Sequence, residues 1–100
     1  MTLASADAPG STEFALAGDI DVTNAGAIGD QLCDLVTNHD TVVVVCDAVT
    51  FVESRGLAMM ARVQRLADES GCHLAWRAFP LHVQRALHVT GLDRYLRIEA

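Results

Sequence analysis

The sequence predicts one α/β domain, with a mixed, mostly parallel sheet of four to five strands packed against three or more helices. Three observations predict it. Strand-like and helix-like segments follow one another in the order β-β-α-β-α-β-α-β. The chain has 100 residues, the length of a single domain. Hydrophobic residues make up 51% of it, enough for one core. We therefore expect residues 1–100 to form one domain.

The first two strands are separated by a turn. Residues 7–11 read Asp-Ala-Pro-Gly-Ser, a turn signal that joins a short strand at residues 2–4 to a second at residues 12–17. Apolar residues alternate with polar or small ones along the second strand, which is the period of a strand. Gly18 and Asp19 are expected to end it. The short first strand leaves a sheet edge that is available for pairing with another strand. A weak homodimer is therefore one alternative for the oligomeric state.

A first helix is expected over residues 24–38. Its apolar residues recur at helical spacing on one face, with polar residues opposite. Thr23 or Asn24 is suited to cap its start. Gly26 and Gly29 each cost about 1 kcal/mol relative to alanine in a helix, so we expect a loose first turn.

The next segments form the centre of the predicted sheet. Residues 41–47 are apolar without alternation, which is typical of a strand covered on both faces. A short turn is expected before the apolar pair at residues 51–52. A second helix then follows over residues 54–70, and Gly71 ends it.

The last third of the chain predicts a strand, a helix and a final strand. The strand covers residues 72–78. Pro80 opens a helix over residues 80–89, and Gly91 stops it. Residues 95–98 are expected to form the final strand.

The helix over residues 54–70 carries apolar residues on more than one face. On a wheel of about 100° per residue, Leu57, Ala58 and Ala61 fall outside the inward arc, on the flank of Ser54 and near Arg65. Such residues are either ordinary surface scatter or a docking face for a partner. The arc expected to face the sheet holds Met59, Met60, Val63, Leu66 and Ala67.

Ser54 has two readings. Serine is a favoured N-cap residue, and most serines at a helix start do nothing more. A helix N-terminus also tolerates an added phosphate, because its free N–H groups and the positive end of the dipole stabilise an anion. A phosphate beside a docking face would change partner affinity with little effect on the fold.

Composition excludes several classes of function. The chain has 13 acidic and 7 basic residues and a net charge of −6, which repels nucleic acid and attracts basic protein surfaces. We expect no secretory signal and no membrane span. The odd cysteine count and the absence of CxxC spacing indicate reduced thiols in the cytosol; these are Cys33, Cys46 and Cys72. We find no phosphate loop, nucleophile elbow or metal-ligand pattern, so we expect no cofactor, no metal and no catalytic residue.

Five segments together resemble the STAS domain family. Residues 16–22 resemble its L-x-G-E-[IL]-D opening. Residues 42–47 resemble its central strand, and residues 49–57 its [VL]-x-[FY]-[IVM]-D-S-[ST]-G-L segment. Residues 80–87 and 89–93 resemble its third helix and the x-[ST]-G-L end of that helix. Each motif is weak alone, but the ordered set covers nearly the whole chain.

The resemblance implies a function. Anti-sigma factor antagonists of this family bind a serine kinase that also sequesters a sigma factor. Phosphorylation of the first serine in D-S-[ST]-G ends the binding, and that serine aligns with Ser54. The resemblance implies a cytoplasmic regulator of transcription that is not an enzyme, with an anti-sigma factor serine kinase as its partner. The expected partner-binding residues are Asp19, Asp21, Glu53, Ser54, Arg55, Gly56, Leu57, Ala58, Ala61 and Arg65.

Three points leave alternatives open. Asp19 and Asp21 belong either to an acidic rim that meets the partner or to a solvated loop. Glu53 stands where the family usually has Asp, and Arg55 where it usually has a small residue. STAS subunits that are not phosphorylated also carry altered D-S-[ST]-G segments. The alternative function is therefore that of a non-phosphorylated STAS subunit in another assembly, such as a lipid-transport complex.

Overall fold

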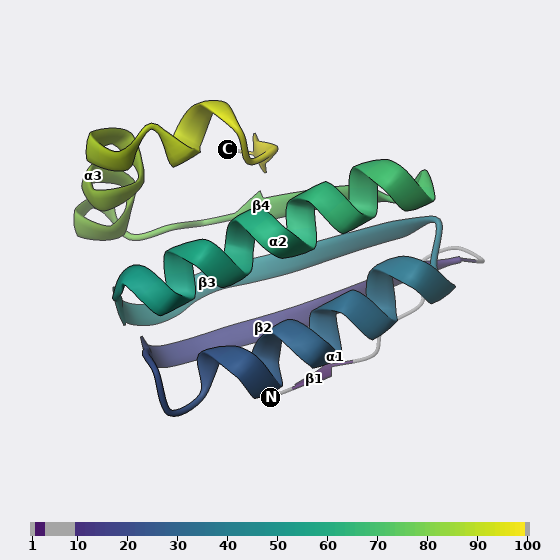
Figure 1. The fold of residues 1–100 in the computed structure, drawn as a ribbon, viewed down its shortest axis with the longest axis horizontal. Coiled ribbons are helices and arrows are strands. Elements are labelled where there is room, and N and C mark those ends of the chain that lie inside the picture. Colours follow the sequence, from purple (N-terminus) through teal and green to yellow (C-terminus); the bar gives the residue numbers. More distant parts are fainter. Residues whose placement is uncertain (1, 4–9, 100) are drawn as a thin grey trace.

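A computed structural model describes residues 2–3 and 10–99 and contains a five-stranded sheet in the order β1-β2-β3-β4-β5 (Figure 1). Strand β1 is antiparallel to β2, whereas β2 to β5 are parallel to their neighbours. The predicted mixed, mostly parallel sheet is therefore confirmed. The strands are β1 (Thr2–Leu3), β2 (Ser11–Ile20), β3 (Thr41–Val52), β4 (His73–Arg77) and β5 (Ile98–Glu99).

The helices connect the parallel strands. Helices α1 and α2 lie side by side across one face of the sheet, and α3 lies beyond the end where β3 finishes (Figure 1). The bounds are α1 (Ala25–Asn38), α2 (Ser54–Ser70), α3 (Leu81–Thr90) and a short 3-10 helix η1 (Leu92–Arg94). Gly71 and Gly91 end α2 and α3 in the left-handed conformation at φ 77°, as the sequence predicts.

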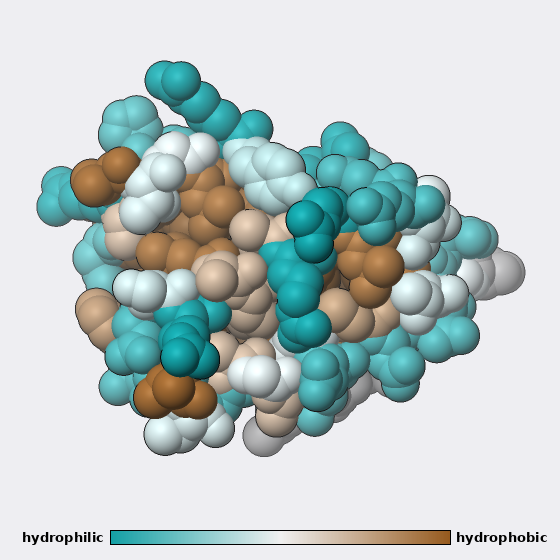
Figure 2. Space-filling view, viewed as in Figure 1, coloured by the Kyte–Doolittle hydropathy of each residue, from teal (hydrophilic) through white to brown (hydrophobic). Residues whose placement is uncertain are grey.

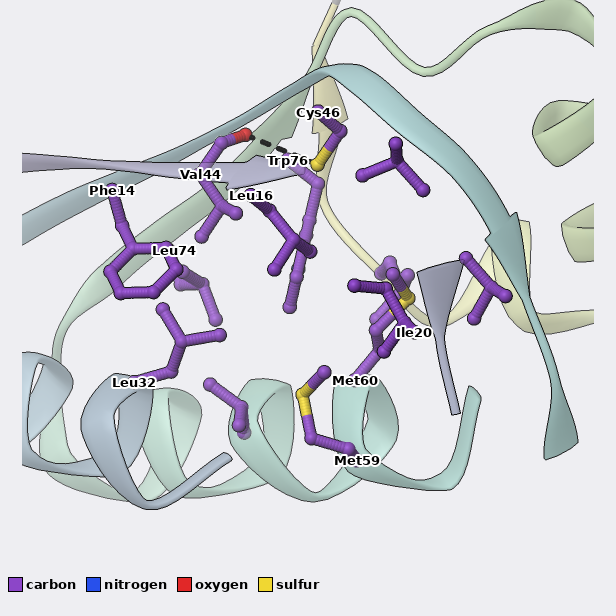
Figure 3. Packing of buried hydrophobic residues seen from close by; sticks show 14 of the residues in the cluster. Phe14, Leu16, Ile20, Leu32, Val44, Cys46, Met59, Met60, Leu74 and Trp76 are labelled. Carbon is purple, nitrogen blue, oxygen red and sulfur yellow. Dashed lines mark hydrogen bonds between the residues drawn. The ribbon is translucent and has the colours of Figure 1, made fainter. Parts of the chain in front are cut away.

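The core lies between the sheet and helices α1 and α2. Alternate side chains of the strands point toward the helices, and methionines of α2 rise to meet them (Figure 3). The indole N–H of Trp76 donates to Oε1 of Gln64 at 3.0 Å, so the largest core side chain has its polar atom satisfied. The fully buried side chains include Phe14, Leu16, Ile20, Leu32, Val44, Cys46, Met60, Leu74 and Trp76.

Two expectations about β2 and β3 are wrong. Gly18 and Asp19 do not end β2, and no turn divides residues 41–47 from residues 51–52. The pairing register shifts twice because β3 has one extra residue between Val45 and Ala48 and another at Thr50. Such bulges break the alternation without ending a strand, and this hides the continuous strand in the sequence.

The expectation that β3 is covered on both faces is also wrong. Val42 and Val44 point into the core and are fully buried. Val43 and Val45 are only half-buried. Helices α1 and α2 thus cover one face of the strand, and the valine run reflects β-propensity as well as burial.

The ends of the chain differ in detail from the expectations. Tyr95 follows η1 and is not part of a strand, and β5 contains only Ile98 and Glu99. Strand β4 is shorter than the predicted 72–78. Of the predicted turn at residues 7–11, only Gly10 and Ser11 lie within the described residues, and Gly10 has a φ of 83°.

Gly29 has a packing role in α1. A Cβ built on Gly29 would overlap the Arg62 guanidinium and lie 2.9 Å from Cγ of Met59. Glycine therefore permits the close approach of α1 and α2. This contact stabilises the helix pair despite the low helix propensity of glycine. From the sequence, Gly29 was expected only to loosen the first turn of the helix.

Two further observations concern the described residues only. None of their helices has both the length and the apolar character needed to cross a bilayer. No cluster of three His, Cys, Asp or Glu side chains in the same part of the chain is arranged as a metal site.

Candidate functional site

The candidate site lies where β2 and β3 end and α1 and α2 begin, at the left of Figure 1. Parallel strands bring their carboxyl ends to one edge of the sheet, and this edge is where such folds commonly bind ligands or partners. The backbone N–H of Glu53 donates to the carbonyl of Ile20 at 3.0 Å, which joins the two strand ends.

Ser54 is the first residue of α2 and is exposed. Glu53 occupies the N-cap position, in an extended conformation with φ −91° and ψ −179°. Within the described residues no side chain caps α2, so the reading of Ser54 as a capping serine is wrong. The Ser54 hydroxyl is left facing solvent beside the unpaired N–H groups of the first helical turn.

Glu53 holds the neighbouring loop. Its Oε1 accepts a hydrogen bond from the backbone N–H of Val22 at 3.1 Å, across 31 positions of sequence. The side chain is half-buried. Glu53 therefore fixes the β2–α1 loop against the start of α2.

Asp19 is part of a hydrogen-bonded support under the site. Its Oδ1 accepts from the Thr50 hydroxyl at 2.5 Å, and its carbonyl accepts from the Asn24 side-chain amide at 2.7 Å. The bulge at Thr50 aims this hydroxyl at β2. Nε2 of His82 in turn donates to the Thr50 carbonyl at 2.5 Å, so the start of α3 is tied to the same strand end.

Asp21 organises the loop that leads into α1. Its carboxylate accepts from both the hydroxyl and the N–H of Thr23, at 2.5 and 2.9 Å, and these bonds lower the Asp21 pKa. Asn24 occupies the N-cap position, but its Oδ1 accepts from the Asp21 N–H instead of capping α1. Within the described residues no side-chain hydrogen bond caps α1, so the predicted capping is wrong although Asn24 holds the N-cap position. Asp19 and Asp21 accept their hydrogen bonds at the solvent-exposed surface.

Gly56 and Leu57 were both expected on an exposed face of the helix, and the structure places them elsewhere. Gly56 is buried, and a Cβ there would lie 2.7 Å from Cγ1 of Val52 and 2.9 Å from Cγ2 of Ile20. Leu57 is half-buried and packs against the core. The predicted wheel is thus wrong for Leu57 and right for the buried Met59, Met60, Val63 and Ala67; Leu66 is only partly buried.

The outward face of α2 carries alanines and arginines. Arg55, Ala58 and Arg65 are exposed, and Ala61 is half-buried. Two shallow hollows, of about 290 and 300 Å³, flank Ala58. We define the α2 face as Arg55, Ala58, Ala61, Arg62, Arg65 and Tyr95.

Two members of the α2 face are absent from the sequence-based site. Arg62 lines both hollows, and Tyr95 lines the second. Helical spacing from Ala58 could have identified Arg62, which lies one turn farther along. Tyr95 has no such signal, because it reaches this face only through η1.

Two of the three cysteines, Cys46 and Cys72, are buried and poorly suited to thiol chemistry. Burial raises the pKa of Cys46 to about 12, and it also raises that of Cys72. Thiols with raised pKa values have little thiolate at neutral pH and are poor nucleophiles.

Comparisons with known proteins agree with this architecture. An anti-sigma factor antagonist from Mycobacterium paratuberculosis is 25% identical, with a TM-score of 0.82 over 98% of this chain and 83% of its own. TM1081 from Thermotoga maritima is 21% identical, with a TM-score of 0.79 over 88% of this chain and 77% of its own. The anti-sigma factor antagonist SpoIIAA, in its unphosphorylated form, is 12% identical, with a TM-score of 0.78 over 100% of this chain and 89% of its own.

Sequence comparison gives the family. No curated protein sequence matches the chain. The family model described as "Mlab, STAS domain" matches residues 4–98. Because this match spans nearly the whole sequence and the fold is that of the solved antagonists, the chain belongs to the STAS domain family.

Proposed function

We propose that this chain is an anti-sigma factor antagonist that binds an anti-sigma serine kinase through the start of α2 and is released when Ser54 is phosphorylated. The position of Ser54 carries the proposal: it is exposed, begins a helix and adjoins a face of small residues. The antagonist from Mycobacterium paratuberculosis supports the general kind of function. The proposal assigns the chain no catalytic step and a cytoplasmic location.

A phosphate on Ser54 is compatible with the fold. It would lie at the positive end of the α2 dipole, where the first N–H groups have no carbonyl partner. Arg55 follows directly and can donate charge-assisted hydrogen bonds to it. Because a phosphate adds about −1.5 to −2 charge at pH 7, it changes the surface strongly while the core stays as it is.

The proposed contact surface contains fewer residues than the set predicted from the sequence. Gly56 supports α2 from inside, so it acts on docking only through the position of the helix. Leu57 is half-buried against the core and offers only the exposed part of its side chain. Ala58 and Ala61 offer the contact area. Asp19, Asp21 and Glu53 order the loops around Ser54, and Arg55 and Arg65 supply charge at its rim.

The test uses kinases from the genome that encodes this chain. The chain is incubated with ATP and each anti-sigma serine kinase, and intact mass and complex formation are followed. We expect one phosphate, absent from Ser54→Ala, and a kinase complex that dissociates as the phosphate appears. A mass increase that persists in Ser54→Ala, or a complex unaffected by phosphorylation, would contradict the proposal.

A pair of variants separates docking from folding. Ala58→Gln places a longer neutral side chain on the exposed face and should weaken the kinase complex at least tenfold. Ser70→Gln makes a similar change at the exposed far end of α2 and should leave binding unchanged. Both variants should unfold at nearly the same temperature as the parent chain, since both sites are exposed.

A STAS subunit of another assembly, such as a lipid-transport complex, is the second candidate. Arg55 favours it, because a long cation replaces the small residue usual beside the serine of phosphorylated members. Stable binding to a transporter ATPase, with no change in mass after incubation with ATP, would select this candidate.

A further inference from the structure

The arginines of this chain are unevenly placed. The sequence has 7 basic residues against 13 acidic ones, yet three of the seven, Arg55, Arg62 and Arg65, are exposed along α2. Helical spacing sets Arg55 about one turn before Ala58, Arg62 one turn after it, and Arg65 one turn after Ala61. A chain with net charge −6 therefore has a basic stretch on α2 between Arg55 and Arg65, around two alanines and before the exposed Asp68 and Glu69.

The surface between these arginines is hollowed. The first hollow is lined by Arg55, Ala58 and Arg62, with Val22 and Met59. The second is lined by Ala58, Ala61, Arg62, Arg65 and Tyr95. Figure 2 shows strongly hydrophilic side chains standing beside a pale-brown strip over α2. The α2 face thus has a low, weakly apolar floor and a guanidinium rim.

The chain itself neutralises little of this charge. Arg62 lies 3.6 Å from Asp30, but both side chains are largely exposed, at 48% and 81%, so the pair is weak. Across residues 10–99, neither Arg55 nor Arg65 forms an ion pair with a carboxylate. Their guanidinium groups are available to an outside acceptor.

We infer that the α2 face docks an acidic protein segment, with carboxylates that pair with Arg62 and Arg65 while its backbone approaches over Ala58. Guanidinium groups bind carboxylates through two parallel hydrogen bonds, and alanine allows close approach. A nucleic acid is disfavoured because its long run of phosphates would also meet the acidic remainder of the chain, whereas a short acidic segment meets only the α2 face. The inference rests on the proposed function only in placing this segment on the anti-sigma partner.

If the docked segment is acidic, phosphorylation of Ser54 is expected to weaken its binding. Ser54 precedes Arg55 and lies about one helical turn before Ala58, so its phosphate would share this face with the partner's carboxylates. The phosphate would pair with the adjacent Arg55 and repel the partner's carboxylates. Release on phosphorylation then follows from electrostatic repulsion, without a change in the fold of the chain.

The test uses a synthetic alanine-rich helical peptide with glutamates at i, i+4 spacing and the full ¹⁵N-labelled chain at low salt. Two-dimensional NMR should show shifts at Ala58, Ala61, Arg62, Arg65 and Tyr95. The dissociation constant should rise at least tenfold in Arg62→Gln/Arg65→Gln, and it should also rise with salt. The matched control, Arg85→Gln/Arg97→Gln, removes two exposed arginines elsewhere and should bind as the parent does.

Several outcomes would overturn the inference. These are equal shifts with a lysine version of the peptide, shifts centred away from α2, or tighter binding of a DNA duplex to the same arginines. Because the peptide needs neither a kinase nor ATP, this result is independent of the phosphorylation experiment. If the peptide binds as expected but no kinase phosphorylates Ser54, the inferred docking surface for an acidic segment is supported and the proposed kinase switch is contradicted.

Discussion

The Glu53 carboxylate accepts a hydrogen bond from the backbone N–H of Val22 at 3.1 Å, which joins the residue before Ser54 to the loop before α1. Glu53 also donates its own N–H to Ile20. The residue that precedes the candidate phosphorylation site therefore holds two segments that are distant in sequence. Its role in this structure is to order the site.

Replacing Glu53 by alanine should loosen this loop. The lost hydrogen bond should lower the free energy of unfolding by about 0.5–1.5 kcal/mol and speed amide hydrogen exchange at Val22. Glu53→Gln keeps an acceptor oxygen and should restore most of the protection. Exchange rates at Val22 that are the same in the alanine variant and the parent would show that this bond does not hold the loop.

Gly56→Ala should destabilise the fold. The added Cβ would lie 2.7 Å from Val52 Cγ1 and 2.9 Å from Ile20 Cγ2, so the first turn of α2 must shift away from the strands. We expect a loss of roughly 1–3 kcal/mol in urea unfolding. Gly26→Ala is the matched control, because nothing lies within 4 Å of its added Cβ. That variant should gain up to about 1 kcal/mol from helix propensity, and equal effects of the two substitutions would refute the packing argument.

Gln64→Leu should also be costly, although it makes the core more apolar. Gln64 is buried, and its Oε1 accepts from the Trp76 indole N–H at 3.0 Å and from the Arg97 backbone N–H at 3.1 Å. Leaving these donors without an acceptor should lower the free energy of unfolding by roughly 1–3 kcal/mol. Gln31→Leu, on the exposed face of α1, should change it by no more than about 0.5 kcal/mol. A neutral Gln64→Leu would mean that the donors find other partners.

Stability should fall in acid partly through Glu99. Arg77 donates to the Glu99 carboxylate at 2.9 Å, and this bond lowers the Glu99 pKa from its ordinary value of 4.5. A carboxyl whose pKa is lower in the folded state contributes stability above its unfolded pKa and loses it as pH falls through the folded value. The loss should therefore develop below about pH 4.5.

Glu99→Gln tests this dependence. Urea midpoints should fall less between neutral pH and about pH 3 in this variant than in the parent chain. Asp21, whose pKa is lowered by Thr23, retains its own contribution to the pH dependence in both proteins. Glu69→Gln, at an exposed position on α2, is the control and should keep the parent's slope. A slope unchanged by Glu99→Gln would contradict the role of the Arg77 pair.

The sequence predicted the layered fold well because hydrophobic periodicity and glycine stops determine most elements. Most of the buried side of α2 and the glycine-capped ends of α2 and α3 follow from these signals alone. The continuity of β3 could not be predicted, since the bulge at Thr50 depends on pairing with β2.

The candidate site was predicted in part. Ser54 could be placed at an exposed helix start because a resemblance fixed its position and the helix spacing fixed its face. The inward turn of Gly56 and the core contact of Leu57 could not be predicted, because they depend on how closely α2 approaches the strand ends. Tyr95 was missed since only the three-dimensional fold brings it beside Ala58.

The affinity of the kinase for the chain before and after phosphorylation is the most direct test of the central claim. Homogeneous unphosphorylated and Ser54-phosphorylated chains are titrated into the same kinase without ATP. We expect the phosphorylated chain to bind at least tenfold more weakly, a difference of about 1.4 kcal/mol. Equal affinities would contradict the account, because the α2 start would then not be the surface that the kinase contacts.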